Sequence, residues 1–453
     1  MKKIFSCIIL VVLSISLLTL TINVKEVKAD AGPKIIYVDD DNVLGPWYGN
    51  QTHPYQNITS GLEHASANAS DTIFVYNGTY NEDLVVNKTV FLKGENRNIT
   101  TISETGTKIV VNVTASNVSI SGFTINNSGM NAPCIYTESQ NLTVENCRII
   151  NRYIGIYVCE SVGLNVTNSM IVGGSYTSIA AQRSSRISIT YNELTNVSKG
   201  HGIDLNGSNT VTVAYNDITH NLNGVFLCNE EADYFDITIS NNYIANNIEG
   251  AGIKIRTGDY RAYPATIMGN TITNNKYAIH HTRYSENSPW YPHNFYYNNF
   301  IDNHNNNITF DQMTAANNWN DSYPSGGNYW SNYNGTDTHS GPNQTEPGWD
   351  GIGDTAYLMD ENNVDRYPVM NPWPLAHLQV HTFADGQGEI EGVKVWVNVT
   401  EQPQYSPADF LLELGIYTVK VETSFTRQDP QDPTKYYRYL TTGKTDQGKI
   451  PER

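Results

Sequence analysis

Asp204 and Lys254 occupy the same place in two copies of a short motif, in which glycine is followed by isoleucine, a polar residue and a hydrophobic residue. His201 directly precedes the first copy, and Arg256 directly follows the second. A carboxyl, an imidazole and two cations are groups that transfer protons and bind charged ligands. If the two copies lie close together in the fold, these four residues can form an acid-base cluster.

The motif belongs to a repeat that runs from about residue 130 to 305. Each copy also holds an alternating run that ends in Asn, one variable residue and a hydrophobic residue, and the period is about 22 to 29 residues. These runs end at Leu194, Ile218, Ile244, Ile272 and Ile301. Alternation with a period of two places Ile, Val and Leu inside and polar residues outside. A fixed period made of short strands predicts a solenoid of stacked parallel strands, a β-helix of about ten coils.

The N-terminal part of the chain contains one convincing helix, over Thr59–Ala67, with Thr59 as N-cap and Leu62 and Ala65 facing inward. A solenoid must cover its open end, so we expect this helix to cap the first coil. We assign residues 1–29 to a signal peptide, 30–374 to the β-helix with its closing loop, and 375–453 to a small β-sandwich.

The outward position of the Gly-Ile strand forms a stripe along the predicted rod that mixes aromatic and ionisable residues. We predict that this stripe binds a ligand through Tyr136, Tyr157, Asp204, Phe226, Lys254 and His280, with Ala180 between the second and third of them. The alternative is an ordinary solvated face. Paired Asp residues do not recur on adjacent coils, as a hydrolase would need, so the stripe favours binding over catalysis.

Two columns of Asn recur once per coil. The first contains Asn192, Asn216, Asn242, Asn270 and Asn299, with Cys147 and Ser169 in earlier coils, and the second contains Asn151, Asn196, His220, Asn246, Asn274 and Asn303. Asn tolerates left-handed backbone angles, and stacked amides can bond from coil to coil. We therefore expect turns and ladders here, not an active site.

Composition and charge limit the function. Lys and Arg total 28 against 45 Asp and Glu, giving a net charge of −17, which argues against a nucleic-acid partner. Charged residues make up only 16% of the chain, and 30 Tyr are present, as is typical of a β-rich extracellular protein. Eighteen Asn-x-Ser/Thr sequons offer glycosylation sites. The cysteines Cys134, Cys147, Cys159 and Cys228 show no metal spacing and are expected to be buried free thiols.

The N-terminus has the pattern of an export signal. Lys2 and Lys3 precede an apolar run from Ile4 to Leu20, and Val27-Lys28-Ala29 is a cleavage pattern of small residues. The alternative is an uncleaved membrane anchor. After cleavage we expect no membrane span, and an extracellular or cell-surface location.

Calcium is the metal that the sequence suggests. Asp337, Asp350 and Asp354 alternate with glycines, as suits a hard cation on a tight loop, and Glu346 and Asp360 are further candidates. The alternative is a capping loop that uses Asp for turns. For copper, the nearest histidines are His280, His281, His293 and His304, but alternation sends His280 outward and His281 inward. Copper is therefore not expected.

The runs Asp71-Thr-Ile-Phe-Val-Tyr-Asn-Gly-Thr-Tyr-Asn-Glu82 and Gly326-Gly-Asn-Tyr-Trp-Ser-Asn-Tyr-Asn-Gly335, with the repeats between them, resemble the NosD-like branch of right-handed parallel β-helix proteins. Asp350-Gly-Ile-Gly-Asp354 and Tyr367-Pro-Val-Met370 look like the closing segment of that branch. The resemblance implies an all-β, single-stranded right-handed β-helix of the pectate-lyase-like kind, in an exported protein of archaeal type. The tail resembles PEGA or carboxypeptidase-regulatory β-sandwich modules.

Three functions remain open. The favoured hypothesis is an exported, non-enzymatic surface protein that binds polysaccharide or cell-envelope proteins along one face. The second is a polysaccharide lyase or hydrolase, in which His201, Asp204, Lys254 and Arg256 are the catalytic candidates. The third is copper handling in the maturation of a metalloenzyme, which the NosD resemblance implies. The sequence leaves the glycan and the oligomeric state open.

Overall fold

The computed structural model describes residues 32–373, apart from 68–69, 105, 107, 128, 130, 231, 305–307 and 311–315, and the backbone of ten strands between 376 and 449. The expected signal peptide at residues 1–29 lies outside the described residues. Within them, none of the helices has the length and apolar character to cross a membrane.

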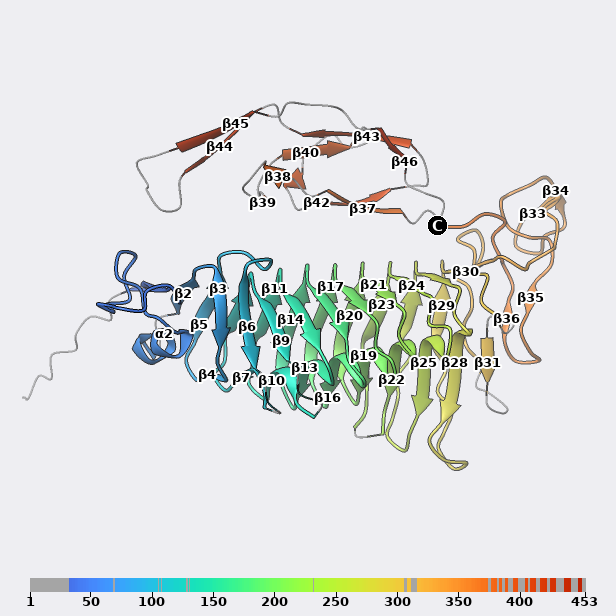
Figure 1. The fold of residues 1–453 in the computed structure, drawn as a ribbon. Helices are drawn as coiled ribbons and strands as arrows, with labels where there is room; N and C mark the ends of the chain where they lie inside the picture. Colours follow the sequence, from blue (N-terminus) through green and yellow to red (C-terminus); the bar gives the residue numbers. More distant parts are fainter. Residues whose placement is uncertain are drawn as a thin grey trace, which may run out of the picture.

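The described chain winds into a right-handed parallel β-helix with three parallel sheets along its length, as the sequence predicted (Figure 1). The first sheet contains β1 (Ile35–Val38), β2 (Asp71–Val75), β5 (Val90–Gly94), β8 (Val118–Ser121), β11 (Leu142–Glu145), β14 (Val162–Thr167), β17 (Ser185–Thr190), β20 (Asn209–Ala214), β23 (Ile237–Ser240), β26 (Thr266–Met268) and β29 (Asn294–Tyr296).

The second sheet carries the outward stripe. It contains β4 (Leu84–Val86), β7 (Val111–Val113), β10 (Pro133–Thr137), β13 (Ile154–Cys159), β16 (Thr177–Gln182), β19 (His201–Asn206), β22 (Asn223–Cys228), β25 (Ala251–Thr257), β28 (Tyr277–Arg283) and β31 (Ile308–Phe310).

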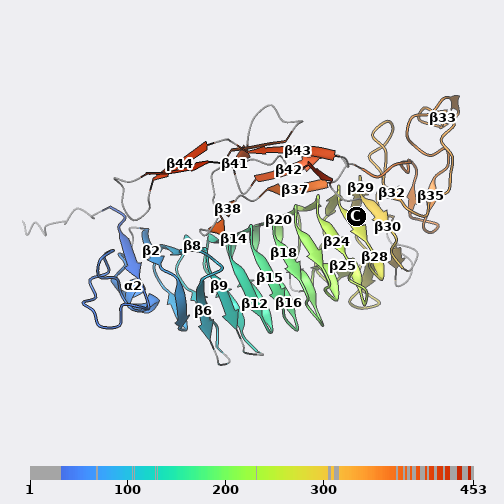
Figure 2. The same ribbon diagram turned by 45° about the horizontal axis from the view of Figure 1, so that its top comes forward.

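The third sheet closes each coil, and its strands lie side by side along the rod in Figure 2. It contains β3 (Gly78–Asn81), β6 (Thr100–Glu104), β9 (Thr124–Asn127), β12 (Arg148–Asn151), β15 (Met170–Gly173), β18 (Glu193–Thr195), β21 (Asp217–Thr219), β24 (Tyr243–Ala245), β27 (Thr271–Thr273), β30 (Asn299–Ile301) and β32 (Tyr329–Trp330).

Fourteen further strands follow the last coils. In the closing segment β33 (His339–Ser340) pairs with β34 (Glu346–Pro347), and β35 (Tyr357–Leu358) pairs with β36 (Val364–Asp365). Beyond residue 375 the antiparallel pairs are β37 (Ala376–Val380) with β42 (Ala408–Leu412), β38 (Phe383–Ala384) with β39 (Gly388–Glu389), and β44 (Ser424–Gln428) with β45 (Tyr436–Leu440). A four-stranded sheet joins β41 (Gln404–Tyr405), β40 (Lys394–Val397), β43 (Ile416–Val421) and β46 (Gln447–Lys449). The β-sandwich at 375–453 stays a prediction.

The alternating pattern fills the interior as expected. In the second sheet Ile156, Ile179, Ile203, Val225 and Ile253 stack in register, and all are fully buried. The glycine that begins each motif has a packing role. A Cβ on Gly202 would lie 2.7 Å from the Cγ2 atom of Ile218 and 2.8 Å from the carbonyl oxygen of Gly224, so this position in β19 has no room for a side chain.

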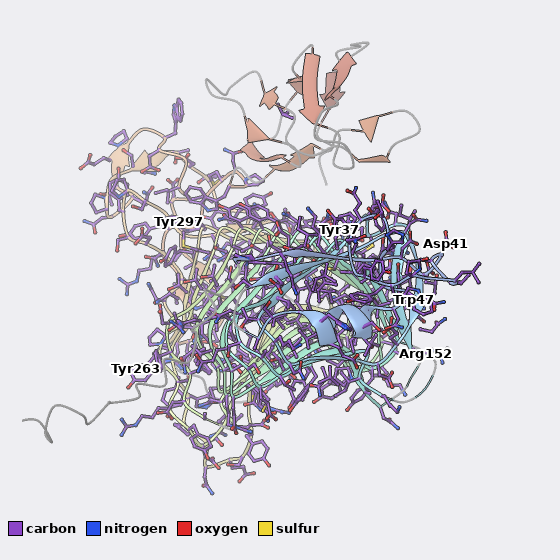
Figure 3. All side chains as sticks on the ribbon, turned by 90° about the vertical axis from the view of Figure 1, so that its left-hand side faces the viewer. Tyr37, Asp41, Trp47, Arg152, Tyr263 and Tyr297 are labelled. Atoms are coloured by element: carbon purple, nitrogen blue, oxygen red, sulfur yellow. The ribbon has the colours of Figure 1, made fainter. Side chains whose placement is uncertain are left out.

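The expected capping helix is present, but its first turn differs from the prediction. Helix α2 (Ile58–His64) packs against β1, β2 and β4 at the N-terminal end of the rod, and Figure 3 shows the rod from this end. Its N-cap is Asn57, whose side chain accepts a 2.8 Å hydrogen bond from the backbone of Ser60. Thr59, the predicted cap, instead donates its hydroxyl hydrogen to Glu82 in the next coil. Leu62 and Ala65 are buried, as predicted.

The first Asn column is a buried ladder with one corrected member. Each side-chain oxygen accepts from the backbone N–H of the preceding rung, in the order Cys147, Ser169, Asn192, Asn216, Asn242, Asn270, Asn298 and Asn328. Asn298 replaces the predicted Asn299, which lies in β30 and bonds to Trp373. The ladder ends on Asp365, whose carboxylate accepts from Asn328 and from the indole of Trp330. The cysteine prediction is also confirmed, because Cys134, Cys147, Cys159 and Cys228 are all buried and none of these four forms a disulfide bond.

The second Asn column is shifted by one residue from the prediction. Its ladder consists of Asn221, Asn247, Asn275 and Asn303, of which only Asn303 was assigned. The other assigned residues, Asn196, His220, Asn246 and Asn274, take left-handed backbone angles directly before the rungs or their equivalents. They are turn residues, as expected, but their side chains are not the rungs of the ladder. Asn151 ends β12 and is buried.

Candidate functional site

The outward stripe of the second sheet has the predicted register. Tyr136, Tyr157, Ala180, Asp204, Phe226, Lys254 and His280 are paired from each strand to the next, from β10 to β28. Ala180 and Phe226 are buried, while the other members of the stripe are half-buried. The sequence therefore located a continuous line of side chains, although parts of it are more enclosed than a solvated face would be.

The four acid-base candidates lie around one aromatic ring. His201 and Asp204 are on β19, Lys254 and Arg256 are on β25, and Phe226 is on the strand between them. The His201 and Phe226 rings are stacked with centroids 4.5 Å apart, and the Arg256 guanidinium lies 5.0 Å from the Phe226 centroid. We call these five residues the Phe226 cluster.

The structure adds two residues that the sequence reasoning missed. Glu230, in the loop after β22, forms an ion pair with Arg256. Tyr176 lies directly before β16. Burial raises the pKa of its hydroxyl; the nearby charges of Asp204 and Glu230 also raise this pKa, and that of Arg256 lowers it. Both residues lie in segments between the strands of the repeat, so the periodic pattern of the strands could not place them.

Long loops flank the Phe226 cluster, and these are visible in the sequence. After β13, β16 and β19 the chain reaches the first sheet across residues 160–161, 183–184 and 207–208. After β22, β25 and β28 the connections to the first sheet are longer and comprise residues 229–236, 258–265 and 284–293. These loops extend the lower edge of the rod in Figure 1. These loops present the exposed aromatic side chains Phe235, Tyr260, Tyr263 and Tyr284. The change in loop length was the available signal for Glu230.

Asp204 is electrostatically unusual. Burial raises the pKa of its carboxyl to about 7, with Arg256 opposing the rise and Glu230 adding to it. Its Oδ1 atom is shielded from solvent and has no hydrogen-bond partner among the described residues. A carboxyl that holds its proton near neutral pH can donate a hydrogen bond or a proton, which an ordinary surface aspartate cannot do.

His201 is held neutral. Burial lowers the pKa of its imidazole to about 3, and the charges of Lys254 and Arg256 act in the same direction. The Asn223 side-chain oxygen accepts a 2.9 Å bond from the backbone of Ala251, so its amide nitrogen is the group 3.2 Å from His201 Nδ1. Nδ1 is therefore the acceptor in this bond, and the ring hydrogen lies on Nε2.

Tyrosine rings continue the surface from this cluster toward the N-terminal coils. Tyr136 and Tyr157 have ring centroids 5.6 Å apart, and Tyr153 and Tyr176 have centroids 5.5 Å apart. The Tyr157 hydroxyl donates a 2.5 Å hydrogen bond to Gln182, which holds this ring in place. These two pairs give the second sheet an aromatic surface next to ionisable groups.

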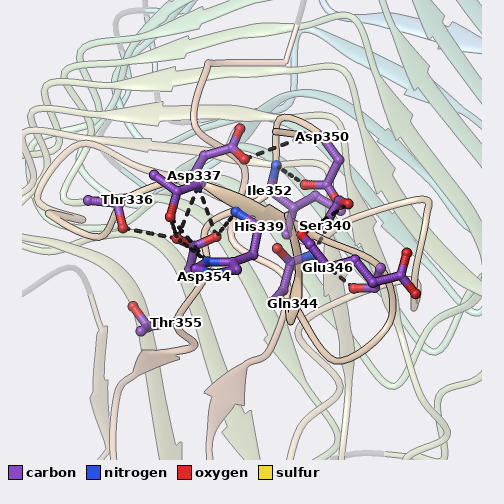
Figure 4. Close-up of polar contacts among 12 residues, drawn as sticks. Thr336, Asp337, His339, Ser340, Gln344, Glu346, Asp350, Ile352, Asp354 and Thr355 are labelled. Atoms are coloured by element: carbon purple, nitrogen blue, oxygen red, sulfur yellow. Dashed lines mark hydrogen bonds and ion pairs between the residues drawn. The ribbon is translucent and has the colours of Figure 1, made fainter. Parts of the chain in front are cut away.

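The predicted calcium residues bind the backbone of their own loop (Figure 4). Asp354 accepts bonds from the backbone of Thr338 and His339 and from the hydroxyls of Thr336 and Thr338. Although burial raises its pKa, these bonds outweigh that effect and hold the pKa well below its usual range. Asp337 accepts from the backbone of Asp350 and Gly351. This bonding is what the alternative, a carboxylate-stabilised capping loop, requires.

Replacing Asp354 with Asn is expected to lower the melting temperature by roughly 2 to 4 °C, because several donors lose a charged acceptor. Differential scanning calorimetry of the purified chain measures the effect. The calcium proposal further requires that a chelator destabilise the unmodified chain and leave Asp354→Asn unaffected. Equal curves with and without chelator remove calcium from this loop.

The histidines divide between surface and interior. His280 is half-buried and His281 is buried, as alternation predicted. The His281 and His293 ring centroids are 5.4 Å apart inside the rod, but both His293 nitrogens have partners, the backbone of Ala265 and the hydroxyl of Tyr234. In the described part of the chain, His, Cys, Asp and Glu side chains do not assemble in threes as a metal site needs.

The sequence model of the family described as periplasmic copper-binding protein (NosD) matches residues 65–261 and 236–335. Together these two matches cover more than half of the chain. The protein belongs to the NosD family. The resemblance inferred from the repeats is therefore confirmed, and the periplasmic family supports an exported β-helix protein. Signal cleavage and an archaeal source stay predictions.

Several solved structures are similar to this NosD-family chain in fold. XylC in complex with xylose is 10% identical, with a TM-score of 0.44 over 59% of this chain and 75% of that one. Pectin methylesterase PemA from Erwinia chrysanthemi is 11% identical, with a TM-score of 0.34 over 54% and 80% of the two chains. The periplasmic alginate epimerase AlgG, in a mutant form, is 16% identical, with a TM-score of 0.33 over 54% and 74%. A search of curated proteins found no match.

Proposed function

We propose that this NosD-family chain is an exported, non-enzymatic protein that binds polysaccharide along the outward face of its second sheet. The observation that carries the proposal is the stripe, which runs in register from Tyr136 and Tyr157 through Asp204 and Phe226 to Lys254. A parallel β-helix repeats its binding groups at the spacing of its strands, about 4.8 Å, so it can bind an extended polymer at several points.

The side chains on this face suit a sugar chain. Tyrosine rings offer a rigid apolar surface and a polar hydroxyl, which match the apolar faces and the hydroxyl groups of a sugar ring. The ring pairs Tyr136–Tyr157 and Tyr153–Tyr176 span adjacent coils. The long loops after β22, β25 and β28 add further exposed aromatic residues beside the same face. A cell-envelope protein is the alternative partner for this surface.

Tyr157→Ala is expected to weaken glycan binding about tenfold, because a central aromatic contact is worth at least about 1 kcal/mol. Affinity electrophoresis against plant, microbial and host glycans measures the loss. Tyr191→Ala is the matched control. Tyr191 stacks on Tyr215 with centroids 5.0 Å apart, but at the corner between the first and third sheets. An equal loss of glycan affinity in Tyr157→Ala and Tyr191→Ala would contradict the proposal. So would a result in which no glycan retards even the unmodified protein.

One observation favours the second candidate, a polysaccharide-cleaving enzyme. Asp204 keeps a proton near neutral pH, and Glu230 beside it is ion-paired with Arg256. Glycoside cleavage uses such a pair, a protonated carboxylic acid and an ionised carboxylate. The same incubations distinguish the two functions. If the protein shortens a glycan and Asp204→Asn does not, the protein is an enzyme. If the glycan is bound but stays intact, the result supports a binding protein.

A further inference from the structure

The loop that follows β1 gathers exposed apolar side chains in one short segment. Residues 43–48 contain four of them, Val43, Leu44, Trp47 and Tyr48. Leu44, at 92%, is the most exposed of the large hydrophobic residues in the described part of the chain. Single exposed apolar residues are common on globular proteins, whereas a contiguous group of them marks an interaction site. We call residues 43–48 the Leu44 loop.

The Leu44 loop lies at the N-terminal end of the rod. It belongs to the dark blue segment that reaches past helix α2 in Figure 1, and Figure 3 shows Trp47 at the rim of this end. The apolar run from Ile4 to Leu20, expected to be an export signal or an anchor, precedes β1 in the sequence. The end of the rod that carries the loop is therefore the end that export or anchoring brings close to a bilayer.

We propose that the Leu44 loop inserts into the interface of a lipid bilayer and attaches the rod there by its N-terminal end. Leu44 supplies an apolar tip, and Trp47 and Tyr48 are of the two residue types that are enriched at the level of lipid headgroups. A single convex loop is too small to bury the about 800 Å² per partner of a stable protein interface. A bilayer sets no such minimum, because binding there scales with the apolar area that is inserted.

Polar groups of the loop are paired within the protein, which lowers the cost of leaving water. The Trp47 indole donates a 2.7 Å hydrogen bond to the carbonyl oxygen of Asn42, and the Asn42 amide donates a 2.7 Å bond to the carbonyl oxygen of Pro54. The backbone N–H of Tyr48 donates a 2.9 Å bond to the carbonyl oxygen of His53. A donor buried without a partner would oppose insertion. These bonds also fix the shape of the loop before it binds.

The charge around the loop favours a neutral lipid. The chain has a net charge of −17, and Asp39, Asp40 and Asp41 lie just before the Leu44 loop in the sequence. Anionic headgroups repel these carboxylates, so electrostatic attraction does not drive the attachment. We therefore expect the loop to prefer phosphatidylcholine to an anionic lipid such as phosphatidylglycerol.

The experiment is fluorescence quenching of the full purified chain by vesicles of phosphatidylcholine that is brominated on its acyl chains. Bromine quenches tryptophan at contact, so the signal reports whether Trp47 itself reaches the acyl chains, with or without the run Ile4–Leu20. We expect quenching in the unmodified chain, and we expect Trp47→Phe to remove it. Trp349→Phe is the matched control, because Trp349 is 84% exposed on the closing segment at the other end of the rod.

A second variant keeps Trp47 as the reporter. Leu44→Ser should reduce the quenching at least about twofold, because less apolar area enters the bilayer. Leu358→Ser removes an exposed leucine from the closing segment and should leave the quenching unchanged. Mixed vesicles of brominated phosphatidylcholine and phosphatidylglycerol should quench less than phosphatidylcholine alone at the same bromine content. Circular dichroism establishes that each variant is folded.

The outcomes that overturn the proposal are distinct. Absence of quenching in the unmodified chain, or quenching that persists in Trp47→Phe, shows that the loop does not insert. Stronger quenching by the mixed vesicles shows electrostatic adsorption in place of apolar insertion. Dimers that sediment in analytical ultracentrifugation and dissociate in Leu44→Ser, without quenching by vesicles, assign the loop to a second copy of the chain. None of these tests uses a glycan, so their failure leaves the proposed function untouched.

Discussion

Replacing Asn242 with Ala is expected to destabilise the rod by about 4 kcal/mol, since the polar groups it leaves unpaired each cost about 1–3 kcal/mol when buried. The Asn242 oxygen accepts 2.9 Å bonds from both the backbone and the side chain of Asn216. Its amide nitrogen donates to the carbonyls of Val213 and Ser240 and to Asn270. Ala can replace none of these bonds in a site that excludes water.

Urea unfolding, followed by far-ultraviolet circular dichroism, measures the change in the free energy of unfolding. Asn242→Asp keeps the acceptor oxygen and loses the donor, so its destabilisation should be separately measurable. Thr212→Ala is the control, because Thr212 is exposed on β20, the strand of the preceding coil that pairs with β23 beside Asn242. A loss below about 1 kcal/mol for Asn242→Ala, or one no larger than the control's, would show that the ladder does not stabilise the coils.

Replacing Asp204 with Asn is expected to stabilise the protein at alkaline pH. The folded-state pKa of Asp204 is raised from 3.8 to about 7, so the stability it contributes is complete below pH 3.8 and is lost as pH rises through 7. Asn resembles the protonated carboxyl and does not incur this cost. Its advantage should therefore be small at pH 4 and reach about 1 to 3 kcal/mol at pH 8, with allowance for partial solvent access.

Thermal unfolding at pH 4, 6 and 8 tests this expectation, with Asp236→Asn as a control on the loop after β22, where the side chain is exposed. A melting temperature of Asp204→Asn that exceeds the wild type by an increasing amount as pH rises would agree with it. A gain that is the same at every pH would mean that ionisation of Asp204 is not the cause. A variant that gains stability while losing glycan binding identifies a residue retained for function.

The repeat made most of the fold predictable. Alternation determines which side chains face inward, so the stripe from Tyr136 to His280 was found in the correct register. The errors were local. The doublet Asn298–Asn299 offers two candidates for one rung, and the period cannot choose between them, whereas the left-handed residue Tyr297 directly before Asn298 does.

The missed parts depend on contacts between coils. Asn57 and Thr59 are both able to cap a helix. Asn57 is the cap because Glu82, in the following coil, accepts a hydrogen bond from the Thr59 hydroxyl. Glu230 lies in a loop with no counterpart in the shorter coils, so alignment of the repeats said nothing about it. The enclosure of Asp204 likewise arises from neighbours on three segments rather than from its own motif.

The buried Asn ladder also has an evolutionary consequence. Every rung from Asn192 to Asn328 presents the same acceptor to the coil before it and the same donors to the coil after it. The members that differ in kind lie at the two ends, where Cys147 and Ser169 begin the ladder and Asp365 is an acceptor without a further rung. A coil such as residues 216–241 is thus interchangeable with its neighbours at both junctions. Duplication or deletion of one whole coil preserves the bonding, so the lineage can change the length of the proposed binding face in single steps without redesigning either end.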